Sequence, residues 1–258
     1  MKHSISLATR LAEARDNDTP PDRLQQLASD SVVTVRRQVA GNPSAPEVAL
    51  LQLAVDMDKE VRMRVARNRN TPPSVLCKLA RDSEQRVRWR VASNSNTPLT
   101  VLRKMACDSE TLVRFRVASN SNLPIDMLQQ LACDSDAQVR LGVAINSHTP
   151  IDMLQQLASD PDEDVRYCVA GHPNTPPAIL QQLAEDSCMY VRCRVAKHPN
   201  TPHATLQQLA WKRDDHCVDV HMVLARNPNT PPDVLAVLAL DVAPEVQQMA
   251  LENLQKRQ

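Results

Sequence analysis

The sequence predicts an all-α protein, a solenoid of about nine 26-residue repeats in which each repeat supplies two short helices. Three observations lead to this fold: a proline at constant spacing, an apolar pattern behind each proline, and a second apolar motif half a repeat later. The prolines stand at positions 20, 46, 72, 98, 124, 150, 176, 202 and 231, so that seven successive intervals are 26 residues and the last is 29. Such self-similarity is the signature of stacked repeats.

The first helix of each repeat is expected to start at this proline, whose fixed φ and missing N–H suit the first turn of a helix. Leucine follows four residues later, leucine (once Met105) seven later and alanine eight later, which makes one apolar stripe at helical spacing. Threonine precedes the proline in seven repeats, as at Thr71, and predicts an N-cap. An aspartate ten residues after the proline, such as Asp82, ends the helix in eight repeats.

The second helix carries the motif V-R-x-x-V-A, for example from Val87 to Ala92. Asparagine or histidine follows it, as at Asn94 and His172. Asparagine tolerates the left-handed conformation that a helix C-cap often needs, and the chain has only three glycines to supply it. We therefore expect these positions to be left-handed C-caps.

A single repeat cannot bury its leucine, valine and alanine face, so neighbouring repeats must stack on one another. We expect one repeat domain over residues 1–258. Residues 1–18 fit the second half of a repeat and predict an N-terminal cap, residues 19–244 hold the stacked repeats, and residues 245–258 are polar enough for a C-terminal cap.

Composition excludes several classes of function. Lys and Arg together number 30, as do Asp and Glu, so no net charge points to a polyanion or a membrane. Three glycines are too few for glycine-rich phosphate loops, and no catalytic constellation or cofactor motif is present, which favours a non-enzymatic protein without a cofactor. The absence of a signal peptide, of 18-residue apolar runs and of C-x-x-C among seven cysteines favours the cytoplasm and excludes a membrane span.

The run from Asn227 to Leu235, N-P-N-T-P-P-D-V-L, together with V-R-x-x-V-A, resembles the leucine-rich repeat variant family, relatives of HEAT repeats. The resemblance covers nearly the whole chain and implies a right-handed superhelix of short helices. One known arrangement in that family adds an N-terminal cysteine-rich segment that holds an iron–sulfur cluster. The first cysteine here is Cys77, so the ligands for such a cluster are missing.

The most repeated charge is the arginine sixteen residues after the proline, which the helical wheel places between buried positions. A half-buried arginine needs a partner, and the aspartate at the end of the first helix of the same repeat is predicted to supply it, much as HEAT-like repeats use an Asp–Arg ladder. We expect a structural role for this set: Arg36, Arg62, Arg88, Arg114, Arg140, Arg166 and Arg192.

The next two positions of the second helix turn away from the core and combine arginine with large apolar side chains, as a binding hot spot does. They predict that the chain binds another macromolecule, foremost a protein. The candidate residues, called the arginine–aromatic stripe below, are Arg64, Trp89, Arg90, Phe115, Arg116, Tyr167 and Arg194.

Two alternatives stay open for the stripe. The rings could pack sideways against the next repeat and leave only arginine exposed. The stripe could also stack bases and neutralise phosphates, and the resemblance to some HEAT-like glycosylases implies a nucleic-acid-binding protein acting on DNA bases. Zero net charge argues against this second alternative, because nucleic-acid-binding domains are usually strongly basic.

The eighth repeat contains three additional residues between Trp211 and His221. Cys217 and His221 are four residues apart and share a helix face, a spacing that can hold Zn²⁺, with His203 and His216 as further ligands. No zinc motif accompanies them, and His221 occupies the position of the repeated arginine. We therefore expect a bulged loop and no metal.

Overall fold

The computed structural model describes residues 5–212 and 217–256, and within these residues it contains 19 helices and no strand. The chain divides into two compact units, Met1–Leu131 and Ala132–Gln258. Every first helix starts one residue after one of the nine recurring prolines. The predicted all-α repeat solenoid is confirmed.

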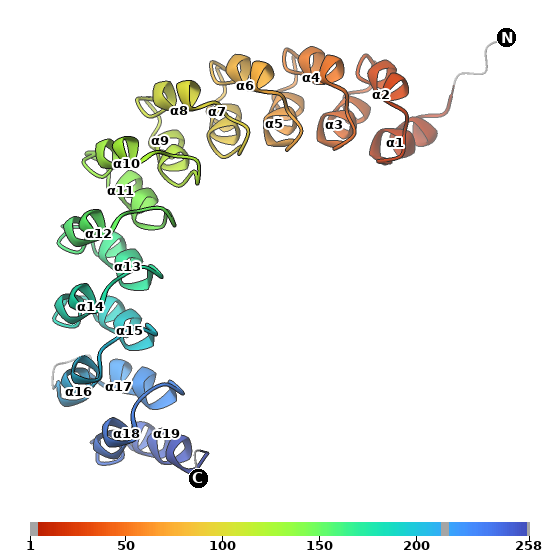
Figure 1. Ribbon diagram of the computed structural model, residues 1–258. Coiled ribbons are helices and arrows are strands. Elements are labelled where there is room, and N and C mark those ends of the chain that lie inside the picture. Colours follow the sequence, from red (N-terminus) through yellow and green to blue (C-terminus); the bar gives the residue numbers. More distant parts are fainter. Residues whose placement is uncertain (1–4, 213–216, 257–258) are drawn as a thin grey trace. The chain divides into compact units, whose positions relative to one another are not determined.

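In the first unit, first and second helices alternate along the chain and form two layers (Figure 1). The first helices are α2 (Pro21–Leu27), α4 (Glu47–Leu53), α6 (Pro73–Leu79), α8 (Leu99–Met105) and α10 (Ile125–Leu131). The helices of the second layer are α1 (Leu7–Arg15), α3 (Val33–Gly41), α5 (Lys59–Arg67), α7 (Gln85–Ala92) and α9 (Thr111–Ala118).

The second unit repeats this arrangement. Its first helices are α12 (Ile151–Leu157), α14 (Pro177–Leu183), α16 (His203–Trp211) and α18 (Pro232–Leu238). The helices of the second layer are α11 (Ala137–Ala144), α13 (Glu163–Gly171), α15 (Met189–Lys197), α17 (Cys217–Arg226) and α19 (Pro244–Gln255). Within both units consecutive second helices pack directly against each other, which sets side chains at the same repeat position in a row.

The core lies between the two layers and is aliphatic. The repeated leucines of the first helices and the valines and alanine of the second are buried, as shown by Leu76, Val87, Val91 and Ala92. Burying a leucine or valine side chain stabilises a fold by about 1.5–3 kcal/mol, so the repeated columns supply most of the driving force for stacking. Aliphatic side chains alone therefore fill the core between the two layers, and neither many aromatic residues nor many glycines are needed.

The prediction that threonine caps the first helices is wrong. Proline itself is the N-cap; Pro72, for example, has an extended backbone (φ −65°, ψ 153°) and α6 begins at the following residue. The threonine side chain turns instead to the preceding second helix, where Thr97 Oγ1 donates to the carbonyl oxygen of Val91 at 2.6 Å. The last carbonyls of a helix lack partners within it, so this bond closes the second helix rather than opening the first.

The left-handed C-cap is also wrong, because no residue of the described part other than glycine has a positive φ. Asn68 is extended (φ −65°, ψ 125°) and reaches into the preceding repeat. Its Nδ2 donates to the carbonyl oxygens of Ala40 and Asn42 at 3.1 and 2.8 Å. His198 does the same with one nitrogen, since its Nε2 lies 3.0 Å from the carbonyl oxygen of His172. This column therefore ties neighbouring repeats together.

The repeated arginine does pair with the repeated aspartate, but with that of the following repeat. Arg88 forms two hydrogen bonds to the Asp108 carboxylate, at 2.8 and 2.9 Å, and a third to the carbonyl oxygen of Asp82 in its own repeat. The same pairing joins Arg36 to Asp56, Arg62 to Asp82, Arg140 to Asp160 and Arg166 to Asp186. Arg114 and Arg192 likewise donate to the carbonyl oxygens of Asp108 and Asp186 in their own repeats.

The reason for the difference is geometric. The aspartate carboxylate already accepts the backbone N–H two residues on, as Asp56 does from Asp58, and so faces the preceding second helix. Burial alone would raise the pKa of the Asp56 carboxyl, but the hydrogen bonds from Arg36 and from that backbone N–H hold its pKa below the ordinary value. Each ion pair is therefore a bond between repeats.

The two ends of the helical stack follow the same pattern. α1 packs against α2 and α3 in the manner of a second helix, and Arg10 pairs with Asp30 at 2.6 Å. α19 fills the second-helix position of the ninth repeat and packs against α17 and α18. The segment predicted as a C-terminal cap is thus the second helix of a repeat.

Candidate functional site

The arginine–aromatic stripe lies on the second helices, at the two positions that follow the ladder arginine. In the first unit, Arg64 on α5, Trp89 and Arg90 on α7, and Phe115 and Arg116 on α9 are all half-buried. The wheel predicted that both positions turn away from the core, and the structure shows in addition that the neighbouring second helices cover part of each side chain.

Guanidinium groups and rings alternate across adjacent repeats. The guanidinium of Arg90 lies 4.8 Å from the centre of the Trp89 ring, and that of Arg116 lies 5.0 Å from the same ring and 5.1 Å from the Phe115 ring. Such contacts are worth about 0.5–1 kcal/mol each at exposed sites. The structure thus brings Trp89, Arg90, Phe115 and Arg116 together in one cluster over α7 and α9.

The cluster contains polar atoms whose hydrogen-bonding capacity is not used. Trp89 Nε1 and Arg90 Nε are buried and have no hydrogen-bond partner in the structure. Buried donors of this kind normally have partners, and exceptions often mark a place where a ligand or ion completes the site. Burial first, and then the positive charges of Arg67 and Arg116, lower the pKa of the Arg90 guanidinium from its ordinary value.

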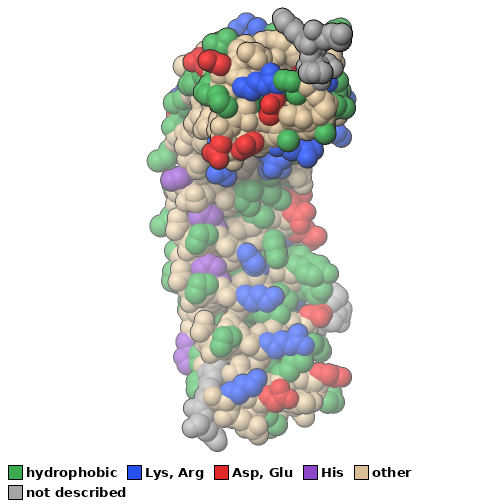
Figure 2. Space-filling view, turned by 90° about the vertical axis from the view of Figure 1, so that its right-hand side faces the viewer, with side chains coloured by type: hydrophobic (Ala, Val, Ile, Leu, Met, Phe, Trp, Pro, Cys, Tyr) green, Lys and Arg blue, Asp and Glu red, His purple; other side chains and the backbone are tan. Residues whose placement is uncertain are grey.

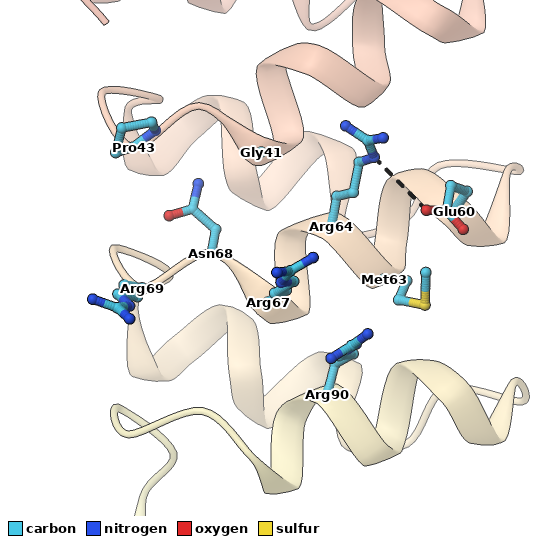
Figure 3. Close-up of a pocket in the computed structure, with 9 residues that line it drawn as sticks. All are labelled: Gly41, Pro43, Glu60, Met63, Arg64, Arg67, Asn68, Arg69 and Arg90. Carbon is cyan, nitrogen blue, oxygen red and sulfur yellow. Dashed lines mark ion pairs between the residues drawn. The ribbon is translucent and has the colours of Figure 1, made fainter. Parts of the chain in front are cut away.

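A pocket of about 460 Å³ opens beside the cluster, between α5 and α7 and below the end of α3. Figure 3 shows Arg64 extending toward Gly41, and Arg90 rising from α7 toward Arg67 and Met63 on α5. The lining residues are Gly41, Pro43, Glu60, Met63, Arg64, Arg67, Asn68, Arg69 and Arg90.

Two pocket arginines, Arg67 and Arg69, are absent from the stripe predicted by sequence. The signal was present in the spacing of Arg62, Arg64, Arg67 and Arg69, four arginines within eight residues. Only Arg62 of this run belongs to the ladder. Comparison of repeats would have found the others, because the next repeat has Ser93 and Ser95 where this one has Arg67 and Arg69.

In the second unit the stripe consists of Tyr167 on α13 and Arg194 on α15. The Arg194 guanidinium lies 5.3 Å from the Tyr167 ring centre, and both side chains are exposed. Arg194 also lies against Gly171, where a β-carbon would collide with its guanidinium. Arg194, Lys197 and Arg226 are exposed on α15 and α17, and Figure 2 shows basic side chains recurring down this face with hydrophobic ones beside them.

The first helices present a different surface. Its polar side chains pair with each other between repeats, as in the bonds between Gln25 and Gln52 and between Arg103 and Asp126. Sequence analysis did not single out its exposed apolar residues, which include Leu99, Ile125 and Ile151. These stand at the first position of their helices, where four of the other six repeats have proline.

The residues considered for zinc have other partners. The buried His221 takes the ladder position, with Nδ1 2.6 Å from Asp241 Oδ2 and Nε2 3.1 Å from the carbonyl oxygen of Leu209. His203 Nε2 lies 2.7 Å from Asp233 Oδ2 at the surface. His216 and most of the expected bulged loop fall at 213–216, outside the described residues. Elsewhere, no group of three or more His, Cys, Asp or Glu side chains is arranged to hold a metal ion.

Of the helices described, none combines the length and the apolar character needed to cross a membrane.

Comparison with known proteins agrees with the repeat geometry. The model of the leucine-rich repeat variant domain matches residues 193–253. A solved structure described as a leucine-rich repeat variant with a novel repetitive structural motif is 27% identical, with a TM-score of 0.62, over 86% of this chain and 88% of that chain.

Two further solved structures align over almost their whole length. The Escherichia coli protein YibA is 18% identical with a TM-score of 0.45, over 99% of both chains. A designed armadillo repeat protein is 13% identical with a TM-score of 0.24, over 97% of this chain and 99% of that chain. No curated protein matches the chain.

The matched segment begins at Cys193 in α15 and runs through the ninth repeat, which contains the motif from Asn227 to Leu235. The same two-helix unit recurs from α2 to α19, and the match in three dimensions covers most of the chain. The chain is a repeat protein of the leucine-rich repeat variant type.

Proposed function

We propose that this chain is a non-enzymatic scaffold that binds a protein partner through the arginine–aromatic stripe of its second helices. The observation that carries the proposal is the cluster over α7 and α9, where the guanidinium groups of Arg90 and Arg116 both contact the Trp89 ring. Tryptophan and arginine dominate the binding energy of protein interfaces, and they do so from partly covered positions that a partner finishes desolvating.

The unused donors support a binding role over packing alone. If the stripe served only to hold repeats together, its polar side chains would be expected to pair between repeats, as Gln25 does with Gln52 and Arg103 with Asp126 on the first helices. Instead Trp89 Nε1 and Arg90 Nε are buried without acceptors, and among the described residues no hydrogen bond or ion pair reaches the Arg90 guanidinium. Carboxylates of a partner would supply acceptors for the terminal N–H groups of the Arg90 guanidinium.

A reducing compartment such as the cytoplasm suits the proposal, because all seven cysteines have unbonded thiols.

The test is affinity capture from the source cell with the immobilised chain, with and without nuclease, followed by binding of the captured partner to purified variants. Trp89→Ala and Arg116→Ala should each weaken binding at least about tenfold, the loss typical of a hot-spot residue, while folding stays intact. Ile125→Ala is the matched control, because it removes an exposed apolar side chain from a first helix.

The salt dependence of the same binding separates the alternative ligand. Capture of a protein partner should persist after nuclease treatment, and its affinity should depend on both the Trp89 ring and the Arg116 guanidinium. A nucleic acid would no longer be captured after nuclease treatment. Its affinity would fall steeply as the salt concentration rises, in proportion to the number of phosphates neutralised. If Ile125→Ala weakens binding while Trp89→Ala and Arg116→Ala do not, the binding face is that of the first helices and the proposal is wrong.

A further inference from the structure

Four arginines, Arg64, Arg67, Arg69 and Arg90, line the pocket beside the cluster, together with a single acidic residue, Glu60. Glu60 lies 3.7 Å from Arg64 and neutralises at most that one charge. No hydrogen bond or ion pair within the described residues involves the side chains of Arg67, Arg69 or Arg90. Three of the four arginines that line this cavity thus have no direct carboxylate contact within the described residues.

The like charges of these arginines make the arrangement electrostatically unfavourable. Like charges in a partly enclosed site repel each other, and the surrounding protein screens them less than bulk water does. The ladder on the same helices shows how the chain accommodates structural arginines, since Arg62, half a turn from Arg64, has the Asp82 carboxylate at 2.6 Å. An anion from outside would relieve the repulsion in the pocket, and the planar guanidinium fork matches carboxylate and phosphate oxygens.

We propose that this pocket binds a cluster of adjacent acidic side chains on a peptide segment of the protein partner. The inference rests on the proposed function, because it names the part of the partner that the stripe holds. Arg90 belongs to both sites: it lines the pocket and lies over the Trp89 ring. A segment whose carboxylates enter the pocket can therefore lay a neighbouring apolar side chain on Trp89.

The distribution of charge favours a compact acidic cluster over a nucleic acid. A groove that follows a phosphate backbone needs positive charge at regular intervals along its length. Here the two repeats after the pocket have serine at the positions of Arg67 and Arg69, namely Ser93, Ser95, Ser119 and Ser121. The stripe arginines continue as Arg90 and Arg116, but the additional pair Arg67 and Arg69 does not recur there, so the positive charge is densest at the pocket, as several neighbouring carboxylates would require.

The probe is a fluorescein-labelled peptide with four consecutive glutamates and a flanking leucine, compared with the same peptide carrying glutamine at the four positions. Binding to the full chain is followed by fluorescence anisotropy at fixed salt. We expect the glutamate peptide to bind at least about tenfold more tightly than the glutamine peptide, since charged hydrogen bonds contribute about 1.5–3 kcal/mol each.

The test variant is Arg67→Gln/Arg69→Gln, which leaves the stripe and the ladder unchanged. It should weaken the glutamate peptide about tenfold or more. The matched control is Arg15→Gln, because Arg15 occupies on α1 the position that Arg67 occupies on α5, is exposed, and does not line the pocket. Its effect should stay below about twofold, as for a surface charge remote from the site.

Several results would overturn the inference. These are no binding of the glutamate peptide to the wild-type chain, equal binding of both peptides, or equal loss in the Arg15→Gln control. A ten-nucleotide oligothymidylate that binds more tightly than the peptide and is released by Arg67→Gln/Arg69→Gln would reassign the pocket to nucleic acid. A glutamate peptide displaced by millimolar inorganic phosphate alone would reduce it to a small-anion site.

The pocket and the proposed function can fail separately. If Arg67→Gln/Arg69→Gln leaves the glutamate peptide bound while Trp89→Ala still weakens the captured partner, only the pocket inference is wrong. If Arg67→Gln/Arg69→Gln releases the peptide while Trp89→Ala and Arg116→Ala leave the captured partner bound, the pocket inference is supported and the stripe only packs the repeats together.

Discussion

Two sets of arginines stand two residues apart on the same second helices, and they have opposite surroundings. Arg88 lies against the core, 2.8 Å from the Asp108 carboxylate, and joins its repeat to the next. Arg90, half a turn further, has the Trp89 ring 4.8 Å away and no carboxylate in contact with it. The repeat thus places one arginine where the fold provides an anion and another where it does not.

The difference teaches that the role of a residue type in a repeat protein depends on its phase on the helix. The ladder position is fixed by stacking, because its aspartate partner also accepts the backbone N–H at the start of a second helix, as Asp108 does from Glu110. The stripe position carries no such requirement and varies between repeats: Arg64, Arg90, Arg116, Gly142, Cys168 and Arg194. Only the position that stacking leaves variable can be adapted to a partner.

The largest expected effect tests this difference directly. Arg88→Ala should destabilise the chain by about 3 kcal/mol, because it leaves the mostly buried Asp108 carboxylate without its counterion. Arg90→Ala should cost less than about 1 kcal/mol, since it removes a cation–π contact and no ion pair. Urea unfolding of the two variants, followed by circular dichroism, measures both, and equal midpoints would show that the ladder and the stripe are energetically the same.

Acid should weaken the ladder and spare the stripe. Burial alone would raise the pKa of Asp108, but its hydrogen bonds to Arg88 and to the Glu110 N–H hold the pKa below the ordinary value. The unfolded chain, whose aspartates titrate near pH 3.9, therefore binds protons first as the pH falls. The contribution of this carboxylate to the free energy of unfolding should be fully present above that pH. It should decline as the pH falls through the pKa that Asp108 has in the folded chain.

Asp108→Asn is the variant that isolates this contribution. It should be less stable than the wild type at neutral pH and lose less stability between pH 5 and the acid limit, because one of the titrating groups is gone. Arg90→Ala, which touches no ladder carboxylate, should keep the wild-type acid profile. Urea midpoints across a pH series give the measurement, and an Asp108→Asn profile parallel to the wild type would contradict the assignment.

The fold could be predicted from sequence because its determinants are local and repeated nine times. What failed was the choice of partner repeat. The pattern predicts Thr71 as the cap of the helix that follows it, Asn68 as a left-handed C-cap and Arg62 as paired with the aspartate of its own repeat, and the structure differs in all three. The structure directs Asn68 to the repeat before and Arg62 to the repeat after. The repeat period predicts where a residue lies within its own repeat. It does not predict whether the hydrogen-bond or ion-pair partner of that residue lies in the same repeat, the one before or the one after.

The candidate site was predictable only in part for a related reason. Trp89 and Phe115 were found because aromatic residues are rare in this chain. Arg67 and Arg69 were missed because Arg67 is the last residue of α5 and Arg69 lies beyond its end, and the pocket forms only when α5 and α7 pack together. A site made by two neighbouring repeats becomes visible once the spacing between helices is known.

A smaller effect measures how far the stripe contributes to stacking. In a double-mutant cycle, Trp89→Ala and Arg116→Ala should be coupled by about 0.5–1 kcal/mol, the range for a partly exposed cation–π contact. Arg103→Ala, on a first helix, provides the control and should show no coupling to Trp89→Ala. A coupling above about 2 kcal/mol would mean that the stripe is mainly a structural contact, like the ladder.

The smallest expected effect compares two glycines at the same repeat position. Gly41 ends α3 and Gly171 ends α13, and each faces the stripe arginine of the next repeat. A β-carbon on Gly41 would lie 3.8 Å from Arg64 Nη1, an ordinary contact, whereas one on Gly171 would collide with the guanidinium of Arg194.

Gly41→Ala should therefore stabilise the chain by up to about 1 kcal/mol, the gain usual for replacing glycine by alanine in a helix. Gly171→Ala should gain little or nothing, because Arg194 must leave its place against the helix and its contact with Tyr167. Adding Arg194→Ala to Gly171→Ala removes the collision and should restore the gain measured for Gly41→Ala. Urea midpoints of the three variants provide the comparison. If Gly171→Ala alone stabilises as much as Gly41→Ala, the stripe arginine moves aside without cost, and its position over Tyr167 has no energetic role in the free protein.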